Sequence, residues 1–282
     1  MDKIQKALEK VKKEGSQGVQ PKPAPHKIEP EGQKVRKKSP SLETKITYQQ
    51  SKVINIDSDT LRHNRLFSYF DGNFVSDQYK IIKTKILEKT REEGLNTILI
   101  TSAMPGEGKS LTAANLAISL ARETSHTVLL VDTDLRKPSL HQLFDIDVQK
   151  GLSDYLIDDT SISDLLINPG ISKLLFLPGK QGIENSPEVI SAPKMEVFVQ
   201  ELKKRYPERY VIFDSPPLIE SADSLILSKY VDGIILVVEA GKTQIGYVKK
   251  VLDLLEDRNL IGLVLNKGEM SEKNKYYNLI KN

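Results

Sequence analysis

The sequence contains no cysteine among its 282 residues. Disulfides, thiolate metal sites and a cysteine nucleophile are therefore excluded. No apolar run approaches the roughly 20 residues that a membrane helix needs. The first residues, MDKIQKALEKVKKEG, also lack the apolar centre of a signal peptide. We therefore expect a cytoplasmic protein.

A strong excess of charge of one sign is also absent. Lysine and arginine number 41 against 38 aspartates and glutamates, which gives a net charge of +3. A field this weak would not draw nucleic acid, so we expect no nucleic-acid partner. Hydrophobic residues make up 39% of the chain, enough for the core of one α/β domain with an appendage.

The first sixty residues differ in composition from the rest. Ile4, Ala7, Leu8 and Val11 have the spacing of one helix face, which predicts an amphipathic helix over residues 1–14. Residues 15–60 are rich in Pro, Lys, Gly and Ser, which predicts a flexible linker. The helix is either a docking element for a partner or a strap across the domain, and the long tether favours docking.

Residues 61–268 are predicted to form an α/β domain. Short apolar runs occur at 96–102, 127–133, 173–178, 209–215, 232–240 and 260–266. Several are continuously apolar, as expected of parallel strands buried on both faces. Helical spacing over 110–122, 188–205, 222–230 and 243–257 completes a three-layer P-loop NTPase fold with a mostly parallel central sheet. Ligands in such folds bind at the carboxyl ends of the strands.

The first apolar run leads into the turn AMPGEGKS, residues 103–110, which precedes a predicted helix. This strand, turn and helix match a P-loop, although Ala103 replaces the usual first glycine. In a P-loop, Lys109 reaches the β- and γ-phosphates and Ser110 ligates Mg²⁺, so ATP and Mg²⁺ are the expected cofactors. The predicted ATP-binding residues are Pro105, Gly106, Glu107, Gly108, Lys109, Ser110 and Leu111.

Acidic residues follow two other strands. Asp132 and Asp134 end the run TVLLVDTD, and Asp214 ends YVIFD. A strand-terminal acid beside a P-loop is typical of the Walker B motif, whose carboxylate holds Mg²⁺. Asn266, at the end of the last run, is either a contact to the adenine edge or an ordinary turn residue.

These three segments resemble the Walker A, A′ and B motifs of the bacterial tyrosine kinases, which serve polysaccharide synthesis and export. The resemblance spans about residues 75–268 and includes LLVDTDLRKPSLHQLF and NSPEVISAPKMEVFVQELKKRY ahead of VIFDSPP. It implies an ATP-dependent protein-tyrosine autokinase with Lys109, Asp132, Asp134 and Asp214 as catalytic residues. The two Walker A′ acids would serve Mg²⁺ and deprotonate the tyrosine, and the metal ligands would be Ser110, Asp132 and Asp214.

The same resemblance implies an assembly. Asp77, Tyr79, Lys80 and Lys83 occupy the places of the family's oligomerisation motif, with lysine twice in place of arginine, so the segment is either a homo-oligomer contact or an ordinary helix. The family's acceptors form a C-terminal tyrosine cluster. In the tail over residues 269–282, Tyr276 and Tyr277 hold the corresponding position.

Partners also follow from the resemblance. The first helix and linker are similar to those of the soluble tyrosine autokinases of exosortase-linked exopolysaccharide clusters. A membrane polysaccharide co-polymerase, a Wzz-like chain-length protein, would be the activator and would recruit the chain to the inner face of the plasma membrane. A cognate tyrosine phosphatase would reverse the reaction.

Two other functions share the predicted fold. A MinD/ParA-like switch ATPase hydrolyses ATP without a protein acceptor, and an ATP-gated assembly scaffold needs no transfer chemistry. The switch ATPases carry a signature lysine five residues before the P-loop lysine, and Met104 stands there in this chain. A neutral thioether cannot supply that charge, which favours the kinase.

Overall fold

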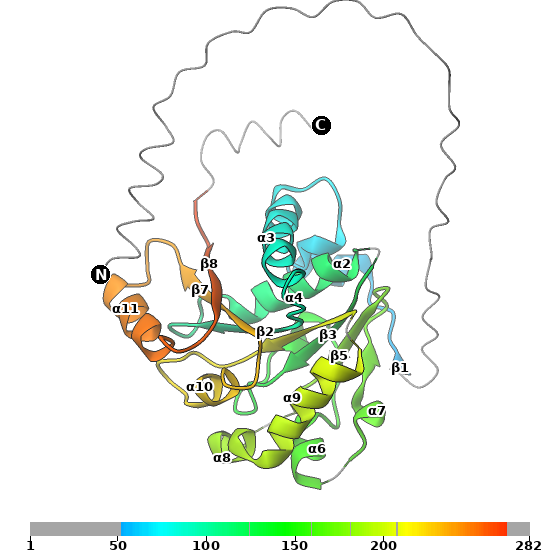
Figure 1. The fold of residues 1–282 in the computed structure, drawn as a ribbon. Helices are drawn as coiled ribbons and strands as arrows, with labels where there is room; N and C mark the ends of the chain where they lie inside the picture. Colours follow the sequence, from blue (N-terminus) through cyan, green and yellow to red (C-terminus); the bar gives the residue numbers. More distant parts are fainter. Residues whose placement is uncertain (1–51, 124, 159, 181, 207, 270–282) are drawn as a thin grey trace, which may run out of the picture. The chain divides into compact units, whose positions relative to one another are not determined.

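The structure is a computed structural model that describes residues 52–269 except 124, 159, 181 and 207. In this part of the chain, strands form one sheet in the order β1-β4-β5-β3-β6-β2-β7-β8 (Figure 1). The strands are β1 (Lys52–Val53), β2 (Thr97–Ser102), β3 (Thr127–Asp132), β4 (Ile167–Asn168), β5 (Leu174–Leu177), β6 (Arg209–Asp214), β7 (Gly233–Glu239) and β8 (Leu260–Asn266). Only the β4–β5 pair in this sheet is antiparallel, which confirms the mostly parallel sheet.

Helices flank both faces of the sheet. They are α2 (Ser58–His63), α3 (Phe74–Thr90), α4 (Lys109–Ala121), α5 (Leu140–Leu143), α6 (Leu152–Asp158), α7 (Ile162–Leu165), α8 (Ser186–Ser191), α9 (Pro193–Arg205), α10 (Asp223–Leu227) and α11 (Ile245–Leu254), with a 3-10 helix η1 (Phe67–Tyr69).

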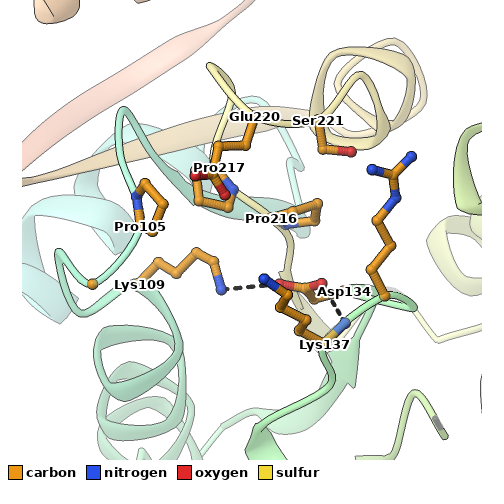
Figure 2. A pocket seen from close by; sticks show the side chains of 10 residues that line it. Pro105, Lys109, Asp134, Lys137, Pro216, Pro217, Glu220 and Ser221 are labelled. Carbon is orange, nitrogen blue, oxygen red and sulfur yellow. Dashed lines mark hydrogen bonds and ion pairs between the residues drawn. The ribbon is translucent and has the colours of Figure 1, made fainter. Parts of the chain in front are cut away.

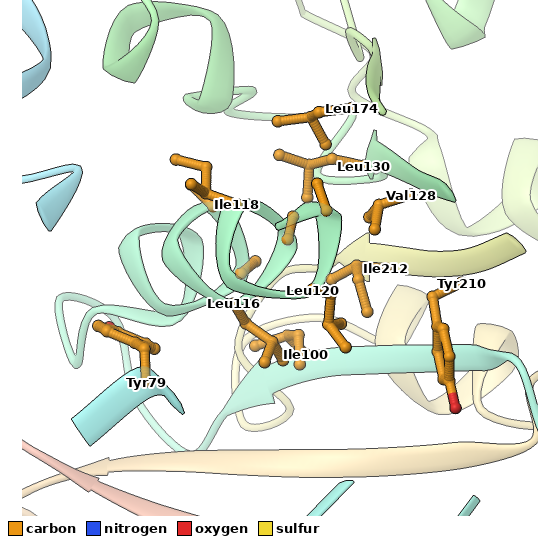
Figure 3. Close-up of a cluster of buried hydrophobic side chains, with 14 of the residues drawn as sticks. Tyr79, Ile100, Leu116, Ile118, Leu120, Val128, Leu130, Leu174, Tyr210 and Ile212 are labelled. Carbon is orange, nitrogen blue, oxygen red and sulfur yellow. The ribbon is translucent and has the colours of Figure 1, made fainter. Parts of the chain in front are cut away.

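Alternate residues of the central strands pack into two separate cores. Ile100 of β2 shares a buried cluster with Leu116 of α4 (Figure 3). Its neighbour Leu99 points to the other face and shares a cluster with Phe198 of α9. Helices α3 and α4 cover the first face, and α6, α9, α10 and α11 cover the second. The strands read as continuously apolar because both of their faces are buried.

The helix predicted over 188–205 is two helices in the structure. Ala192 has an extended backbone, with φ −63° and ψ 144°, between α8 and α9. The following residue is Pro193, whose ring disfavours a helical conformation in the residue before it. The proline therefore ends α8 and occupies the first position of α9, where its missing N–H costs nothing.

The folded domain begins earlier than the predicted boundary at residue 61. Strand β1 pairs with β4, and the Ile54 N–H donates to the Asn168 carbonyl at 2.8 Å. Helix α2 begins at Ser58, with Asp57 as its N-cap. Residues 52–60 were predicted as the end of the linker. Their backbone pairing and helix cap, which the apolar pattern does not reveal, place them in the fold.

Several predictions lie outside the described residues. These are the helix over 1–14, the linker over 15–51 and the tyrosine pair Tyr276 and Tyr277. Within the described ranges, none of the helices combines the length and the apolar character needed to cross a membrane.

Candidate active site

The predicted site residues meet where three strands end. In the sheet order, β6 lies between β3 and β2, so the ends of all three strands are adjacent. Asp132 of β3 is directly opposite Asp214 of β6 in the ladder. The P-loop follows β2 on the other side of β6. The sheet order thus brings Lys109, Asp132, Asp134 and Asp214 to one edge.

The P-loop depends on two glycines with left-handed backbone. Gly106 has φ 78° and Gly108 has φ 91°. A Cβ on Gly108 would collide with the side-chain nitrogen of Asn266. Both the dihedral angle and the close approach require glycine at this position. The chain then turns directly into α4 at Lys109, so the helix N-terminus faces the site.

Lys109 is largely buried among acids. Its Nζ lies 3.3 Å from Oδ2 of Asp134 and donates to the Ser110 hydroxyl at 3.2 Å. The Ser139 hydroxyl also donates to Ser110 Oγ at 3.2 Å. Burial lowers the pKa of Lys109, but the negative charges around it, that of Asp214 foremost, outweigh this effect and raise the pKa. Lys109 is therefore firmly charged.

Asp132 and Asp214 are fully buried but differ in their contacts. Oδ2 of Asp132 accepts the Ser139 and Leu140 N–H groups, each at 3.0 Å, and so holds the turn into α5. Neither carboxylate oxygen of Asp214 has a hydrogen-bond partner within the described part of the chain. An orphaned buried carboxylate is costly unless another group completes its contacts.

Both buried carboxyls have raised pKa values. Burial raises the pKa of Asp132 to about 8, and the adjacent charge of Asp214 adds to the effect. Burial also raises the pKa of Asp214, against the opposing charge of Lys109. The two carboxyls therefore disfavour being ionised side by side, and a divalent cation would relieve that repulsion.

The donor set fits Mg²⁺ that arrives with a nucleotide. Among the residues that the structure describes, no three His, Cys, Asp or Glu side chains are placed to hold a metal by themselves. Mg²⁺ commonly uses only one or two protein carboxylates, together with water and substrate phosphates. The orphaned oxygens of Asp214, with Asp132 opposite it in the ladder and the Ser110 side chain nearby, match that requirement.

A cavity of about 260 Å³ opens beside the P-loop (Figure 2). The ion pair of Lys109 and Asp134 lines this cavity, and of the three predicted aspartates only Asp134 does so. Oδ1 of Asp134 accepts the Lys137 N–H at 3.0 Å, which fixes the carboxylate in this orientation. Asp132 does not line the cavity. The structure gives Asp132 and Asp134 different surroundings, a buried turn for one and an open cavity for the other.

Sequence reasoning missed several residues that line this cavity. They are Arg136, Lys137, Pro216, Pro217, Glu220 and Ser221. Arg136 and Lys137 follow Asp134 directly, so the basic pair after a strand-terminal acid was the available signal. Glu220 and Ser221 had no such signal, because they reach the cavity through the path of the chain after β6.

The P-loop is tied to the ends of β7 and β8. The buried carboxylate of Glu107 accepts the Met104 N–H at 2.9 Å and also the Thr243 hydroxyl. The Asn266 amide donates to the Glu107 carbonyl at 2.8 Å, and Lys267 donates to the Gly106 carbonyl at 2.7 Å. Glu107 and Asn266 therefore stabilise the P-loop through contacts within the chain, and a contact with ATP stays a prediction for both.

The predicted oligomerisation residues lie on α3 with partners inside the chain. Lys80 pairs with Asp77 at 3.0 Å, and Lys83 pairs with Glu123 at 3.0 Å. Tyr79 is buried, and burial raises the pKa of its hydroxyl. These contacts account for the residues within one chain, so a role in assembly stays a prediction.

Comparisons with known proteins give the family of this chain. The model of the AAA domain family matches residues 95–258. Tyrosine-protein kinase YwqD of Bacillus subtilis is 34% identical over 203 residues, which cover 71% of this chain and 84% of YwqD. The chain belongs to the bacterial tyrosine kinase family. The succinoglycan biosynthesis transport protein ExoP of Rhizobium meliloti is 34% identical over 64% of this chain and 23% of ExoP.

Solved structures show the same fold. The chimerical protein CapA2B2 superposes with a TM-score of 0.67 at 29% identity, covering 77% of this chain and 93% of that one. The septum site-determining protein MinD of Pyrococcus horikoshii, complexed with Mg-ADP, gives a TM-score of 0.53 at 26% identity over 63% of this chain and 72% of MinD. MinD is thus a more distant relative than the kinases.

Proposed function

We propose that the protein transfers the γ-phosphoryl group of ATP to tyrosine side chains of its own chain and thereby regulates exopolysaccharide synthesis and export. The observation that carries this proposal is the ion pair of Lys109 with Asp134 in the lining of one cavity. A phosphate-binding cation and a carboxylate able to accept a proton then face the same space. Membership of the kinase family and the similarity to ExoP support the polysaccharide role.

ATP would bind along the P-loop. Backbone N–H groups of residues 105–111 and the N-terminus of α4 would hold the phosphates, with Lys109 on the β- and γ-oxygens. Asn266 would reach the adenine edge by exchanging its contact with the Glu107 carbonyl. Ser110, Asp132 and Asp214 would hold Mg²⁺. When bound, Mg²⁺ would neutralise charge on the phosphates and on the transferred group.

The transfer requires a proton acceptor. The tyrosine oxygen forms a bond to the γ-phosphorus while the bond from that phosphorus to the β–γ bridging oxygen breaks, and ADP leaves. A tyrosine hydroxyl has a pKa near ~10, so its proton has to be removed as the new bond forms. Oδ2 of Asp134 takes that proton. Lys109 stabilises the negative charge of the transferred group.

The acceptors would be Tyr276 and Tyr277 of a neighbouring copy. Contacts through Asp77, Tyr79, Lys80 and Lys83 on α3 would bring copies together as a homo-oligomer. Lysine forms single contacts where the family's arginine grips a carboxylate at two points. We therefore expect a weaker assembly than one built on arginine.

A membrane polysaccharide co-polymerase would serve as activator and recruit the chain to the inner face of the plasma membrane. The helix over residues 1–14 and its tether would add a second contact that raises local concentration. The name of ExoP, a transport protein of succinoglycan biosynthesis, supports such a link. A cognate tyrosine phosphatase would reset the cycle.

A switch ATPase is disfavoured by Met104. Its side chain is partly buried against one of the two core clusters and carries no charge. The kinase and the ATPase are separated by incubating the purified chain with γ-labelled ATP and Mg²⁺. Label on tyrosine supports the proposal, whereas label recovered only as free phosphate refutes it.

A further inference from the structure

Arg136 is a cation of the cavity wall that the proposed transfer leaves unused. Its Nε donates to the Ser186 hydroxyl at 2.9 Å. Its two terminal nitrogens have no hydrogen-bond partner among the described residues, and the side chain lines the cavity. Arg136 is exposed at the cavity. An arginine held by one nitrogen, with the other two unpaired, is arranged to receive an anionic group.

The anchor of Arg136 is fully buried. The Ser186 hydroxyl, which accepts from Arg136, donates in turn to Oδ2 of Asp223 at 2.6 Å. Ser186 and Asp223 are 0% and 1% exposed, and the other oxygen of Asp223 has no partner in the part of the chain described. The positive charge of Arg136, one hydroxyl away, offsets that buried acid. The loop after β3 is thereby fixed to α8 and α10.

This anchor places Arg136 on the acceptor side of the cavity. Pro105 and Lys109 of the P-loop lie on one side in Figure 2, Ser221 lies on the other, and Asp134 lies between them. The Asp223 N–H donates to the Ser221 hydroxyl at 3.3 Å, so the relay ends at the wall away from the P-loop. In the proposed reaction the ATP phosphates would take the P-loop wall, which leaves the other wall to the incoming tyrosine.

We infer that Arg136, held by Ser186 and Asp223, binds a carboxylate beside the acceptor tyrosine and so selects tyrosines with acidic neighbours. The inference rests on the proposed kinase function and names its substrate class. Lys273 and Lys275 precede Tyr276 in the chain's own tail. Arg136 and Lys137 repel these positively charged lysines. Acid-flanked tyrosines of other polypeptides are therefore better acceptors than this tail.

Two synthetic peptides test the selection. They share one sequence, in which the tyrosine is flanked by glutamates in one peptide and by glutamines in the other. With the full chain and saturating Mg·ATP, the KM for the glutamate peptide is expected to be roughly tenfold lower, since a charge-assisted hydrogen bond is of that strength. Arg136→Ala is expected to remove this difference between the two KM values.

Matched variants define the role of the anchor. Arg91→Ala, whose guanidinium contacts His126 and Glu123 away from the cavity, is expected to behave as the parent. Arg136→Lys keeps the positive charge but not the planar guanidinium with its paired donors. It should retain part of the preference for the glutamate peptide. Ser186→Ala should raise the KM for the glutamate peptide about threefold, and should add nothing to Arg136→Ala if Ser186 acts through Arg136.

Other outcomes would overturn the inference. An Arg136→Ala protein that still prefers the glutamate peptide refutes it. An equal fall in kcat for both peptides, with their KM values unchanged, would instead place Arg136 on the transferred phosphoryl group. Matched peptides with phenylalanine for tyrosine, titrated by fluorescence anisotropy in the presence of ADP, measure the same preference without turnover. This binding readout separates failure of the inference from failure of the kinase proposal.

Discussion

The ammonium of Lys109 lies 3.3 Å from Oδ2 of Asp134, and both groups face one cavity. In this structure the phosphate-binding cation and the proton acceptor of the proposed reaction are thus paired with each other. Phosphates bound at the P-loop would draw Lys109 away. Oδ2 of Asp134 would then be free to accept the tyrosine proton. Binding of the donor therefore prepares the base for the acceptor.

This relationship predicts that Asp134→Asn separates binding from transfer. An amide oxygen can still accept the Lys137 N–H, so the loop keeps its shape, but an amide does not take up a proton at neutral pH. We expect phosphotransfer to fall at least about 100-fold, within the range of general-base catalysis. Affinity for a non-hydrolysable ATP analogue, measured by calorimetric titration, should change less than about threefold. A loss of nucleotide binding would reduce Asp134 to a metal ligand or structural group.

Asp214→Asn is expected to lower kinase activity and to raise the stability of the fold. The buried carboxylate of Asp214 has no hydrogen-bond partner among the described residues, so an amide of equal size is cheaper to bury. We expect the free energy of unfolding in metal-free buffer to rise by about 1 kcal/mol. Kinase activity should be lost or should require at least about tenfold more Mg²⁺. Urea denaturation and a Mg²⁺ titration measure the two effects, and a destabilised variant would contradict the account.

Much of the fold follows from the sequence because buried parallel strands are continuously apolar, and runs such as ILI and VIF identify them. The order of the strands does not follow. Asp132 and Asp214 are 82 positions apart in the chain, yet they become neighbours because β3 and β6 pair. No local pattern encodes that pairing, since any two of these strands are equally apolar.

The same limit explains the missed site residues. Thr243 reaches Glu107 because β7 lies next to β2. Ser186, at the start of α8, reaches Arg136 of the loop after β3 although 50 positions separate them. Short polar side chains such as these serve as caps and turn residues throughout proteins, so their identity alone indicates no function. The P-loop was predictable because its glycines, lysine and serine are contiguous.

Thr243→Ala is expected to loosen the P-loop. Its hydroxyl donates to the buried Glu107 carboxylate and accepts the Glu239 N–H at 2.9 Å. Loss of a hydrogen bond to a buried charged group should lower the free energy of unfolding by about 1.5–3 kcal/mol and weaken ADP binding several-fold. Thr243→Ser keeps the hydroxyl and is the matched control. Equal effects of the two substitutions would mean that methyl packing, not the hydrogen bond, holds the loop.

The contacts of Asp232, which directly precedes β7 and does not line the cavity, predict that the stability of the fold depends on pH. Its Oδ2 accepts both N–H groups of Asn96 and Thr97 at 3.0 Å, and its Oδ1 pairs with Lys203 at 2.8 Å. Burial raises the pKa of Asp232, but the Lys203 and Thr97 contacts outweigh burial and lower it.

Because the folded-state pKa is lowered, this stabilisation is present above the unfolded-state pKa near ~4 and is lost as the pH falls through the folded-state value. Asp232→Asn should therefore destabilise the fold by about 1–3 kcal/mol at pH 7. The difference from the parent should shrink below about pH 4. Urea denaturation across this range measures it, and a difference independent of pH would contradict the assignment.

The most direct test of the kinase account is phosphosite mapping of the purified full chain after incubation with Mg·ATP, in parallel with Lys109→Met. Lys109 begins α4 at the edge of the cavity and belongs to neither apolar core cluster, so the variant should keep its fold, as circular dichroism can verify. We predict phosphotyrosine on the parent, at Tyr276 or Tyr277, and none on the variant. Phosphate released from ATP by the parent without any phosphotyrosine, or equal phosphotyrosine on both proteins, would contradict the account.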